Sequence, residues 1–341
     1  MTCAAAILGC AGAVLTPSEK AFFAEVRPWG FILFKRNVET PEQVRALVAE
    51  LRRTVQRADA PVLIDQEGGR VQRLGPPHWR RYPPGRAYGR LASNDPLFRR
   101  EITRLGARLL AHDLAALGIN VDCVPVLDVP DPSGHEIIGD RAYAETPGEV
   151  ACLGRAAAEG LIAGGVLPIL KHIPGHGRAR ADSHLELPVV EASWDDLDAR
   201  DFAPFKALSD MPMAMTAHVI YAAIDARRPA TTSRSVMRRA IRGAIGFDGL
   251  LMSDDLSMKA LAGGFQDRAE AAIAAGCDMV LHCNGDMAEM QAVVAGAGRL
   301  RGRALRRAQA ALARLPKAVE PFDAAEGRAR FDAAFEGGWA A

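Results

Sequence analysis

The sequence predicts an α/β fold of the (β/α)8 TIM-barrel type, in which eight parallel strands alternate with helices. Eight short apolar runs recur along the chain of 341 residues, and most are hydrophobic at nearly every position. Continuous runs of this kind are typical of parallel strands buried on both faces. Longer amphipathic segments separate the runs, and this alternation indicates a parallel sheet. Eight strands without a second block favour a closed barrel.

The predicted strands span residues 4–8, 30–34, 61–64, 119–127, 167–170, 213–216, 250–252 and 279–281. The clearest predicted helices span residues 41–56, 96–117, 147–164 and 233–245. An open, doubly wound sheet is the alternative fold. It would place a G-x-G-x-x-G phosphate turn after the first strand, and Gly9-Cys10-Ala11-Gly12 does not match that pattern.

The chain beyond residue 285 carries no visible chemistry. An Ala/Arg-rich stretch predicts one long helix over residues 287–315, which Pro316 and Pro321 end. We expect the remaining tail to pack on the barrel exterior or to stay partly mobile. No linker separates a second domain, so we expect residues 1–341 to form one domain, with a barrel core at about 1–285 and a helix and tail at about 286–341.

Composition narrows the class of protein. Hydrophobic residues make up 49% of the chain and charged residues 24%, which allows a large core. The net charge of +1 gives no indication of a nucleic-acid or membrane partner, and no apolar run is long enough to span a bilayer. The six cysteines form no CxxC pair, which argues against a zinc site. No basic residue precedes Lys20, so a secretory signal is not predicted, and we expect a cytoplasmic monomer.

Charged residues follow six of the predicted strands, at the ends where barrel enzymes build their active sites. The segments are Asp65–Arg73 (DQEGGRVQR), Gly139–Arg141 (GDR), Lys171–Gly177 (KHIPGHG) with Asp182–His184 (DSH), His218, Ser253–Met258 (SDDLSM) and His282. Any one of them is explained equally well by a helix cap or a structural ion pair. Their convergence on one mouth predicts an active site.

This ordered motif set resembles that of the β-N-acetylglucosaminidases of glycoside hydrolase family 3, over about residues 30–285. The KH-x-PGHG motif followed by DSH is its most specific part. The resemblance implies a retaining β-N-acetylhexosaminidase that forms a covalent glycosyl-enzyme and needs no metal or other cofactor. It also implies that the substrate is a terminal β-linked GlcNAc, and a cytoplasmic member would suit removal of GlcNAc from peptidoglycan-derived muropeptides.

The resemblance places the nucleophile at Asp254. Strand alternation favours the same residue, because it puts Leu250, Met252 and Asp254 on one face and Asp255 on the other. We expect Asp255 to turn outward and hold the following turn.

The resemblance assigns proton transfer to His184, paired with Asp182. A carboxylate beside an imidazole orients the ring and raises its pKa, which suits an acid and base near neutral pH. The glycine-rich loop before His184 has no large apolar anchor, so we expect it to close over substrate. Arg178 stands where many relatives have an acidic residue, which alters the charge of this loop.

The resemblance also implies a set of substrate-binding residues: Asp65, Arg73, Arg141, Lys171 and His172. Asp65 can accept hydrogen bonds from two sugar hydroxyls, and the cationic side chains can donate them. Arg141 has a structural alternative, an ion pair beside Asp140. We expect Glu67 and Arg70 to stabilise their loop and His176 to be structural.

Three other interpretations stay open. A metal-dependent hydrolase would use histidine ligands, yet the chain has no HxH pair. A catalytically silent sugar-binding barrel would tolerate loss of Asp254 or His184, and both are present. A phosphorylase, or another β-glycosidase of the same family, would keep the fold and change the acceptor or the sugar.

Overall fold

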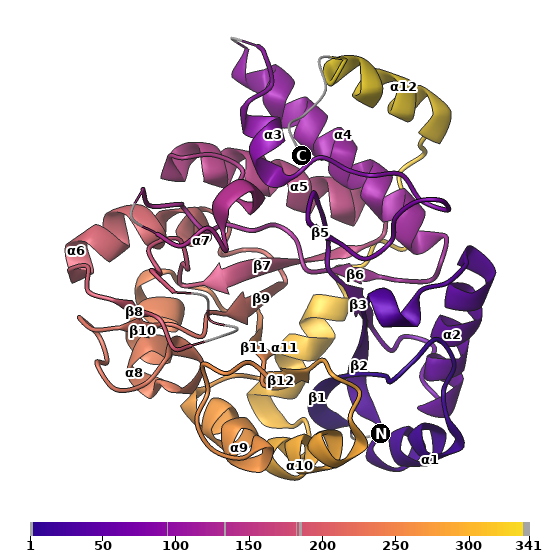
Figure 1. Ribbon diagram of the computed structural model, residues 1–341, viewed down its shortest axis with the longest axis vertical. Helices are drawn as coiled ribbons and strands as arrows, with labels where there is room; N and C mark the ends of the chain where they lie inside the picture. The colour runs from indigo at the N-terminus through magenta and orange to yellow at the C-terminus, as the bar shows by residue number, and fades with distance from the viewer. Residues whose placement is uncertain (1–2, 94, 133, 182, 184–185, 337–341) are drawn as a thin grey trace.

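The computed structural model describes residues 3–93, 95–132, 134–181, 183 and 186–336 (Figure 1). Within this part of the chain, eight strands close a parallel barrel in the order β1-β12-β11-β9-β7-β6-β3-β2, which confirms the predicted TIM-type fold. The strands are β1 (Ala4–Gly9), β2 (Pro28–Leu33), β3 (Val62–Ile64), β6 (Val121–Asp122), β7 (Leu167–Ile173), β9 (Met213–Thr216), β11 (Leu250–Asp255) and β12 (Met279–His282). Two small sheets outside the barrel pair β4 (Gln66–Gly68) with β5 (Val71–Gln72) and β8 (Val189–Val190) with β10 (Ile220–Tyr221).

The barrel strands are buried on both faces, as their continuous apolar runs predict. Every residue of β1, β2, β7 and β12 is buried. Leu63 pairs with Val121 and Met213 pairs with Ile169, so the predicted neighbours meet in parallel register. Removal of branched apolar side chains from water on both faces supplies the main driving force for this core.

Helices surround the barrel, and several begin at a Thr-Pro pair. Thr16, Thr40 and Thr146 each accept a hydrogen bond from the backbone three residues later, and proline occupies the next position. This arrangement satisfies a free amide and sets the backbone angle for the first turn. The outer helices are α1 (Pro17–Val26), α2 (Pro41–Thr54), α3 (Gly85–Gly89), α4 (Pro96–Ala115), α5 (Pro147–Ala163), α6 (Trp194–Asp196), α7 (Ala203–Ala207), α8 (Arg234–Val236), α9 (Phe265–Ala275), α10 (Met287–Ala297), α11 (Gly302–Leu312) and α12 (Ala324–Ala334). Single 3-10 turns lie at η1 (Lys35–Asn37), η2 (Gly139–Arg141) and η4 (Ala230–Thr232), and π-helical segments lie at η3 (Leu197–Asp201) and η5 (Met237–Ala244).

The prediction of one long helix over residues 287–315 is wrong. The chain forms α10 and α11, separated by residues 298–301. Gly298 has φ of 65°, and its carbonyl accepts the amide of Ala5 at 2.9 Å. The amide of Leu300 donates to the carbonyl of Cys3 at 2.9 Å. The break therefore ties the last part of the chain to the start of β1.

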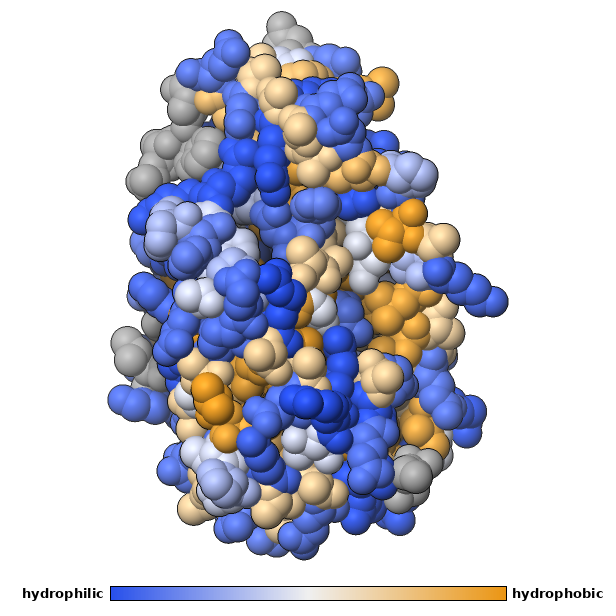
Figure 2. All heavy atoms as spheres, turned by 90° about the vertical axis from the view of Figure 1, so that its right-hand side faces the viewer, coloured by the Kyte–Doolittle hydropathy of each residue, from blue (hydrophilic) through white to orange (hydrophobic). Residues whose placement is uncertain are grey.

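The C-terminal tail packs on the outside of the barrel. Helix α12 lies along α4 (Figure 1), and the buried ring of Phe331 contacts the rings of Tyr82, Tyr88 and Phe335. The face that carries α12 is hydrophilic over most of its area, with hydrophobic atoms in small scattered groups (Figure 2). Among the described residues, no helix combines the length and apolarity needed to cross a membrane. That the whole chain acts as a single domain stays a prediction.

Candidate active site

A cavity of about 320 Å3 opens at the carboxyl ends of the barrel strands. Six of the eight residues predicted for the site line it: Asp65, Arg73, Arg141, Lys171, His172 and Asp254. They come from segments that follow or end β3, β7 and β11, together with η2. Asp182 and His184 lie outside the described residues, whereas Ser183 between them lines the cavity. Motifs that are distant in the sequence but follow barrel strands therefore line one cavity, as predicted from their positions at the strand ends.

Asp65 lies between two cations. Lys171 Nζ donates to Asp65 Oδ1 at 2.9 Å, and Arg73 Nη2 donates to Oδ2 at 3.0 Å. Burial acts to raise the pKa of Asp65, but the charges of Lys171 and Arg73 outweigh it and hold the pKa well below its usual range. Asp65 is therefore an ionised acceptor with a fixed orientation, which suits recognition of sugar hydroxyls.

Glu67 lines the cavity and binds two cations of the site, Arg141 and Lys171, so its role is not limited to stabilising its loop. Arg141 donates to both carboxylate oxygens of Glu67 at 2.8 Å, and Lys171 Nζ lies 2.6 Å from Oε1. Despite burial, these cations lower the pKa of Glu67 to about 2. Arg141 does form the ion pair that its structural alternative expected, but with Glu67, whereas Asp140 pairs with Arg70 at 3.1 Å.

Asp128 orients two histidines, and the sequence analysis did not single it out. His172 Nδ1 donates to Asp128 Oδ2 at 2.7 Å, and the amide of His176 donates to Oδ1 at 2.7 Å. Asp128 is fully buried, and the neighbouring His172 helps to lower its pKa to about 2 against the effect of burial. The fixed Nδ1 contact leaves Nε2 of His172 directed away from Asp128, on a ring that lines the cavity.

His176 lines the cavity as well as supporting it. Its Nε2 lies 3.0 Å from Ser183 Oγ, and its Nδ1 is buried without a hydrogen-bond partner among the described residues. Burial lowers the pKa of His176 to about 4, and the charge of Asp254 acts in the opposite direction. His176 is thus a neutral imidazole next to the segment that carries Ser183.

Asp254 and Asp255 both border the cavity, because β11 departs from strict alternation at this point. Met252 pairs with Met279 whereas Asp255 pairs with Leu281, which marks an irregularity between them. Asp255 Oδ1 accepts the amides of Ser257 at 3.0 Å and Cys283 at 3.2 Å. Asp255 therefore holds the following turn, as predicted, but the prediction that it turns outward is wrong, because it lines the cavity with Asp254. Asp254 Oδ1 accepts the adjacent amide of Asp255 at 2.8 Å.

His218 and His282 take supporting places around the same mouth. His218 contacts the hydroxyl of Thr231 at 2.7 Å and the carbonyl of Asp255 at 3.0 Å. His282 is buried against the ring of Phe265, with Nε2 3.3 Å from Glu289. In the described part of the chain, no three His, Cys, Asp or Glu side chains are grouped so that they could hold a metal ion.

Comparison with known proteins identifies the family of the chain. The model of the glycosyl hydrolase family 3 N-terminal domain matches residues 19–315. The chain belongs to glycoside hydrolase family 3. The family predicted from the motifs is therefore confirmed, and the interpretation as a catalytically silent barrel gains no support.

Relatives of this family 3 chain are β-hexosaminidases. A β-hexosaminidase of Methylococcus capsulatus is 42% identical over 277 residues, which cover 80% of each chain. Native NagZ from Neisseria gonorrhoeae has a TM-score of 0.84 and 33% identity, covering 98% of this chain and 96% of that chain. The same NagZ was solved in complex with N-trifluoroacetyl-D-glucosamine, at a TM-score of 0.81 and 32% identity over 98% of each chain. The chain is an enzyme, a glycoside hydrolase of the β-hexosaminidase group.

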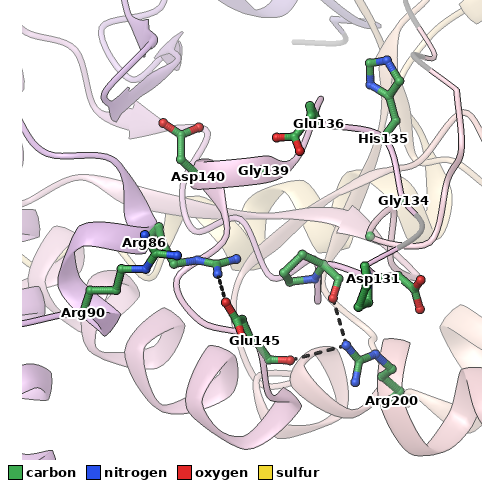
Figure 3. Close-up of a pocket in the computed structure, with 13 residues that line it drawn as sticks. Arg86, Arg90, Asp131, Gly134, His135, Glu136, Gly139, Asp140, Glu145 and Arg200 are labelled. Carbon is green, nitrogen blue, oxygen red and sulfur yellow. Dashed lines mark hydrogen bonds and ion pairs between the residues drawn. The ribbon is translucent and has the colours of Figure 1, made fainter. Parts of the chain in front are cut away.

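A second pocket of this family 3 enzyme, of about 610 Å3, is lined in part by the segment 134–140, which also borders the active-site cavity (Figure 3). Ile137 and Ile138 line the active-site cavity, whereas His135 and Asp140 line the second pocket. Two of its three arginines are held by the protein itself: Arg86 pairs with Glu145 at 2.6 Å, and Arg200 donates to the carbonyl of Pro130 at 2.8 Å (Figure 3). This pocket therefore has mixed charge.

Proposed function

We propose that the chain is a retaining exo-β-N-acetylglucosaminidase in which Asp254 is the nucleophile and His184, oriented by Asp182, is the acid and base. The observation that carries this proposal is that Asp254 lines the same small cavity as the ionised Asp65 and its two cations. A cavity of about 320 Å3 suits one sugar, so recognition of a single terminal residue follows from its size.

Sugar binding is assigned to the charged network. The oxygens of Asp65 keep lone pairs that can accept hydroxyl protons of the sugar, and Arg73, Lys171 and Arg141 offer donors that are already fixed by carboxylates. His172 adds Nε2, with its ring position set by Asp128. Fixed polar groups of this kind lose little freedom when the sugar binds. The bound GlcNAc analogue in the NagZ structure supports a GlcNAc-type ligand here.

The proposed reaction has two displacements. In the first, a carboxylate oxygen of Asp254 attacks the anomeric carbon while the bond to the leaving oxygen breaks and His184 gives that oxygen a proton. In the second, His184 takes a proton from water, whose oxygen attacks the same carbon and releases Asp254. Two inversions retain the β configuration. A cytoplasmic role on muropeptides from peptidoglycan belongs to the proposal and rests on the sequence resemblance.

Hydrolysis of aryl N-acetyl-β-glucosaminide and aryl β-glucoside, by the wild type and by Asp254→Asn and His184→Ala, tests this function. We expect the wild type to prefer the N-acetyl substrate and Asp254→Asn to be inactive. His184→Ala should retain more activity, because an aryl leaving group needs little protonation. A wild type that prefers the glucoside would contradict the substrate assignment.

Two further measurements test the mechanism. Trapping with a fluorinated sugar and mass spectrometry should place the covalent sugar on Asp254, and an adduct on another residue would overturn the assignment. Turnover in phosphate and in a non-nucleophilic buffer separates hydrolysis from phosphorolysis. We expect the free sugar in both buffers, and a sugar phosphate would identify a phosphorylase.

A further inference from the structure

A positively charged cleft of about 650 Å3 lies between the segment 227–234 and helix α9. We call it the arginine cleft, and the four arginines that line it are Arg227, Arg228, Arg234 and Arg268. Among the described residues, no aspartate or glutamate lines it, in contrast to the pocket of Figure 3, where Arg86 pairs with Glu145.

Three of these arginines lack a close carboxylate partner in the described part of the chain. The side chains of Arg227, Arg228 and Arg234 are exposed, and none forms an ion pair with a described residue. The nearby Asp225 accepts the hydroxyl of Ser233 at 2.6 Å and the backbone amide of Arg227 at 3.1 Å, and it offsets part of the charge of Arg228, which helps to lower the pKa of Asp225 against the effect of burial. Three unpaired guanidinium groups on one cleft leave donors for carboxylates of a ligand.

Arg268 connects the cleft to the active-site mouth. Its Nη1 donates to the carbonyls of Leu256 at 2.6 Å and Met258 at 3.3 Å, in the turn that follows Asp254 and Asp255. Met258 lines the active-site cavity, and Ala260 two residues later lines the arginine cleft. The cleft is therefore next to the entrance of the cavity.

The rest of the lining of the arginine cleft is apolar except for Thr232. The apolar residues are Leu187, Pro229, Ala260, Leu261, Ala262, Ala271, Ala274 and Ala275. A cleft that combines apolar side chains with guanidinium groups suits a short chain that has both alkyl and carboxylate parts. The active-site cavity has room for one sugar, so whatever is attached to the leaving oxygen lies outside it.

We propose that the arginine cleft binds the carboxylates of an acidic peptide that is attached to the leaving-group sugar. This inference rests on the proposed function, since it takes the leaving group to be the peptide-bearing part of the substrate. Its effect is on binding of the substrate, because exposed cations far from the reacting bond stabilise ground state and transition state equally. Screening by salt should weaken it.

Three substrates test the proposal: a GlcNAc-terminated disaccharide with an acidic tripeptide, the same molecule with its carboxyl groups amidated, and aryl N-acetyl-β-glucosaminide. The variant is Arg227→Glu/Arg228→Glu/Arg234→Glu, and the control is Arg306→Glu, an exposed arginine on α11. For the acidic substrate we expect the triple variant to raise KM about tenfold at low salt with little change in kcat. Kinetics on the amidated and aryl substrates should change by less than about twofold, and the control should match the wild type on all three.

The outcomes separate the two proposals. Suppose that the wild type hydrolyses the aryl substrate, and that the triple substitution changes KM for the acidic and amidated substrates equally or changes neither. The arginine cleft then has no such role, and the proposed function stands. If the wild type does not hydrolyse the aryl substrate, the proposed function fails and this inference fails with it.

Discussion

The ammonium group of Lys171 lies 2.6 Å from the carboxylate of Glu67 in the lining of the cavity, and both side chains are buried. The same ammonium donates to Asp65 at 2.9 Å. One cation thus compensates two carboxylates, and the charges of the site depend on each other.

Replacing Lys171 with methionine should destabilise the fold. Both carboxylates would lose their shared buried partner, at an expected cost of about 3–5 kcal/mol in the free energy of unfolding. Urea denaturation measures it. The matched control is Lys206→Met, which removes the half-exposed pair with Asp198 and should cost less than about 1 kcal/mol. An equal loss of unfolding free energy in the two variants would show that the two buried carboxylates do not depend on Lys171.

Asp254→Asn should abolish activity without loss of stability. Asp255→Asn should lower stability and keep activity. An amide is no nucleophile, so we expect kcat of Asp254→Asn to fall at least about a thousandfold. Asp255 accepts from Ser257 and Cys283, and its amide variant loses part of this turn. Initial rates and thermal melts of both variants check the division. A stable, inactive Asp255→Asn beside an active Asp254→Asn would exchange the roles.

The barrel was predictable because each of its strands is a short apolar run. The break between α10 and α11 was not, since the Ala/Arg-rich stretch favours helix throughout. It is set by contacts from Ala5 to Gly298 and from Leu300 to Cys3, almost 300 residues apart in the chain. Local propensity contains no information on such partners.

The candidate site could likewise be predicted only in part. The ends of the predicted strands located Asp65, Lys171 and Asp254, but the sequence does not show which side chains pair with one another in the folded chain. Arg141 follows Asp140 in sequence and yet pairs with Glu67, because the short turn η2 directs the two side chains to different neighbours. Asp128 follows the predicted strand 119–127 directly, so the strand-end signal was present and was not used.

Asp128→Asn should weaken the dependence of the unfolding free energy on pH below about pH 4. The pKa of Asp128 is about 2 in the folded chain against 3.8 for an ordinary aspartate, so its contribution is complete above pH about 4 and is lost as pH falls towards 2. Unfolding free energies of wild type and variant should converge between pH 4 and about pH 2. Parallel curves would mean that the contact between Asp128 and His172 contributes no pH-dependent stability. KM for the sugar should also rise, since His172 loses its orientation.

Asp122→Asn should have the opposite pH dependence. Burial raises the pKa of Asp122 to about 8, although the amide of Gln66 donates to its Oδ1, and Oδ2 has no partner among the described residues. A raised carboxyl pKa costs stability as pH rises from about 4, and the full cost is reached above about pH 8. The unfolding free energy of the variant, relative to that of the wild type, should therefore increase between pH 5 and pH 8. Chemical denaturation at both values measures the difference, and a constant difference would contradict the raised pKa.

Phe331→Ala should release α12 from the barrel. The ring is fully buried against Tyr82, Tyr88 and Phe335, and Gly106 of α4 leaves the space it fills, since a Cβ there would lie 2.8 Å from the ring. Loss of this ring should cost about 3–5 kcal/mol in unfolding free energy, from lost burial and the remaining cavity. Arg330→Ala is the control, because its side chain is 61% exposed and pairs with the exposed Glu101. Hydrogen exchange should show faster exchange in α12 for Phe331→Ala alone. If exchange in α12 is equally slow in both variants, the helix is held by its ion pairs, Arg328 with Asp113 at 2.7 Å and Arg80 with Asp332, and not by the aromatic cluster.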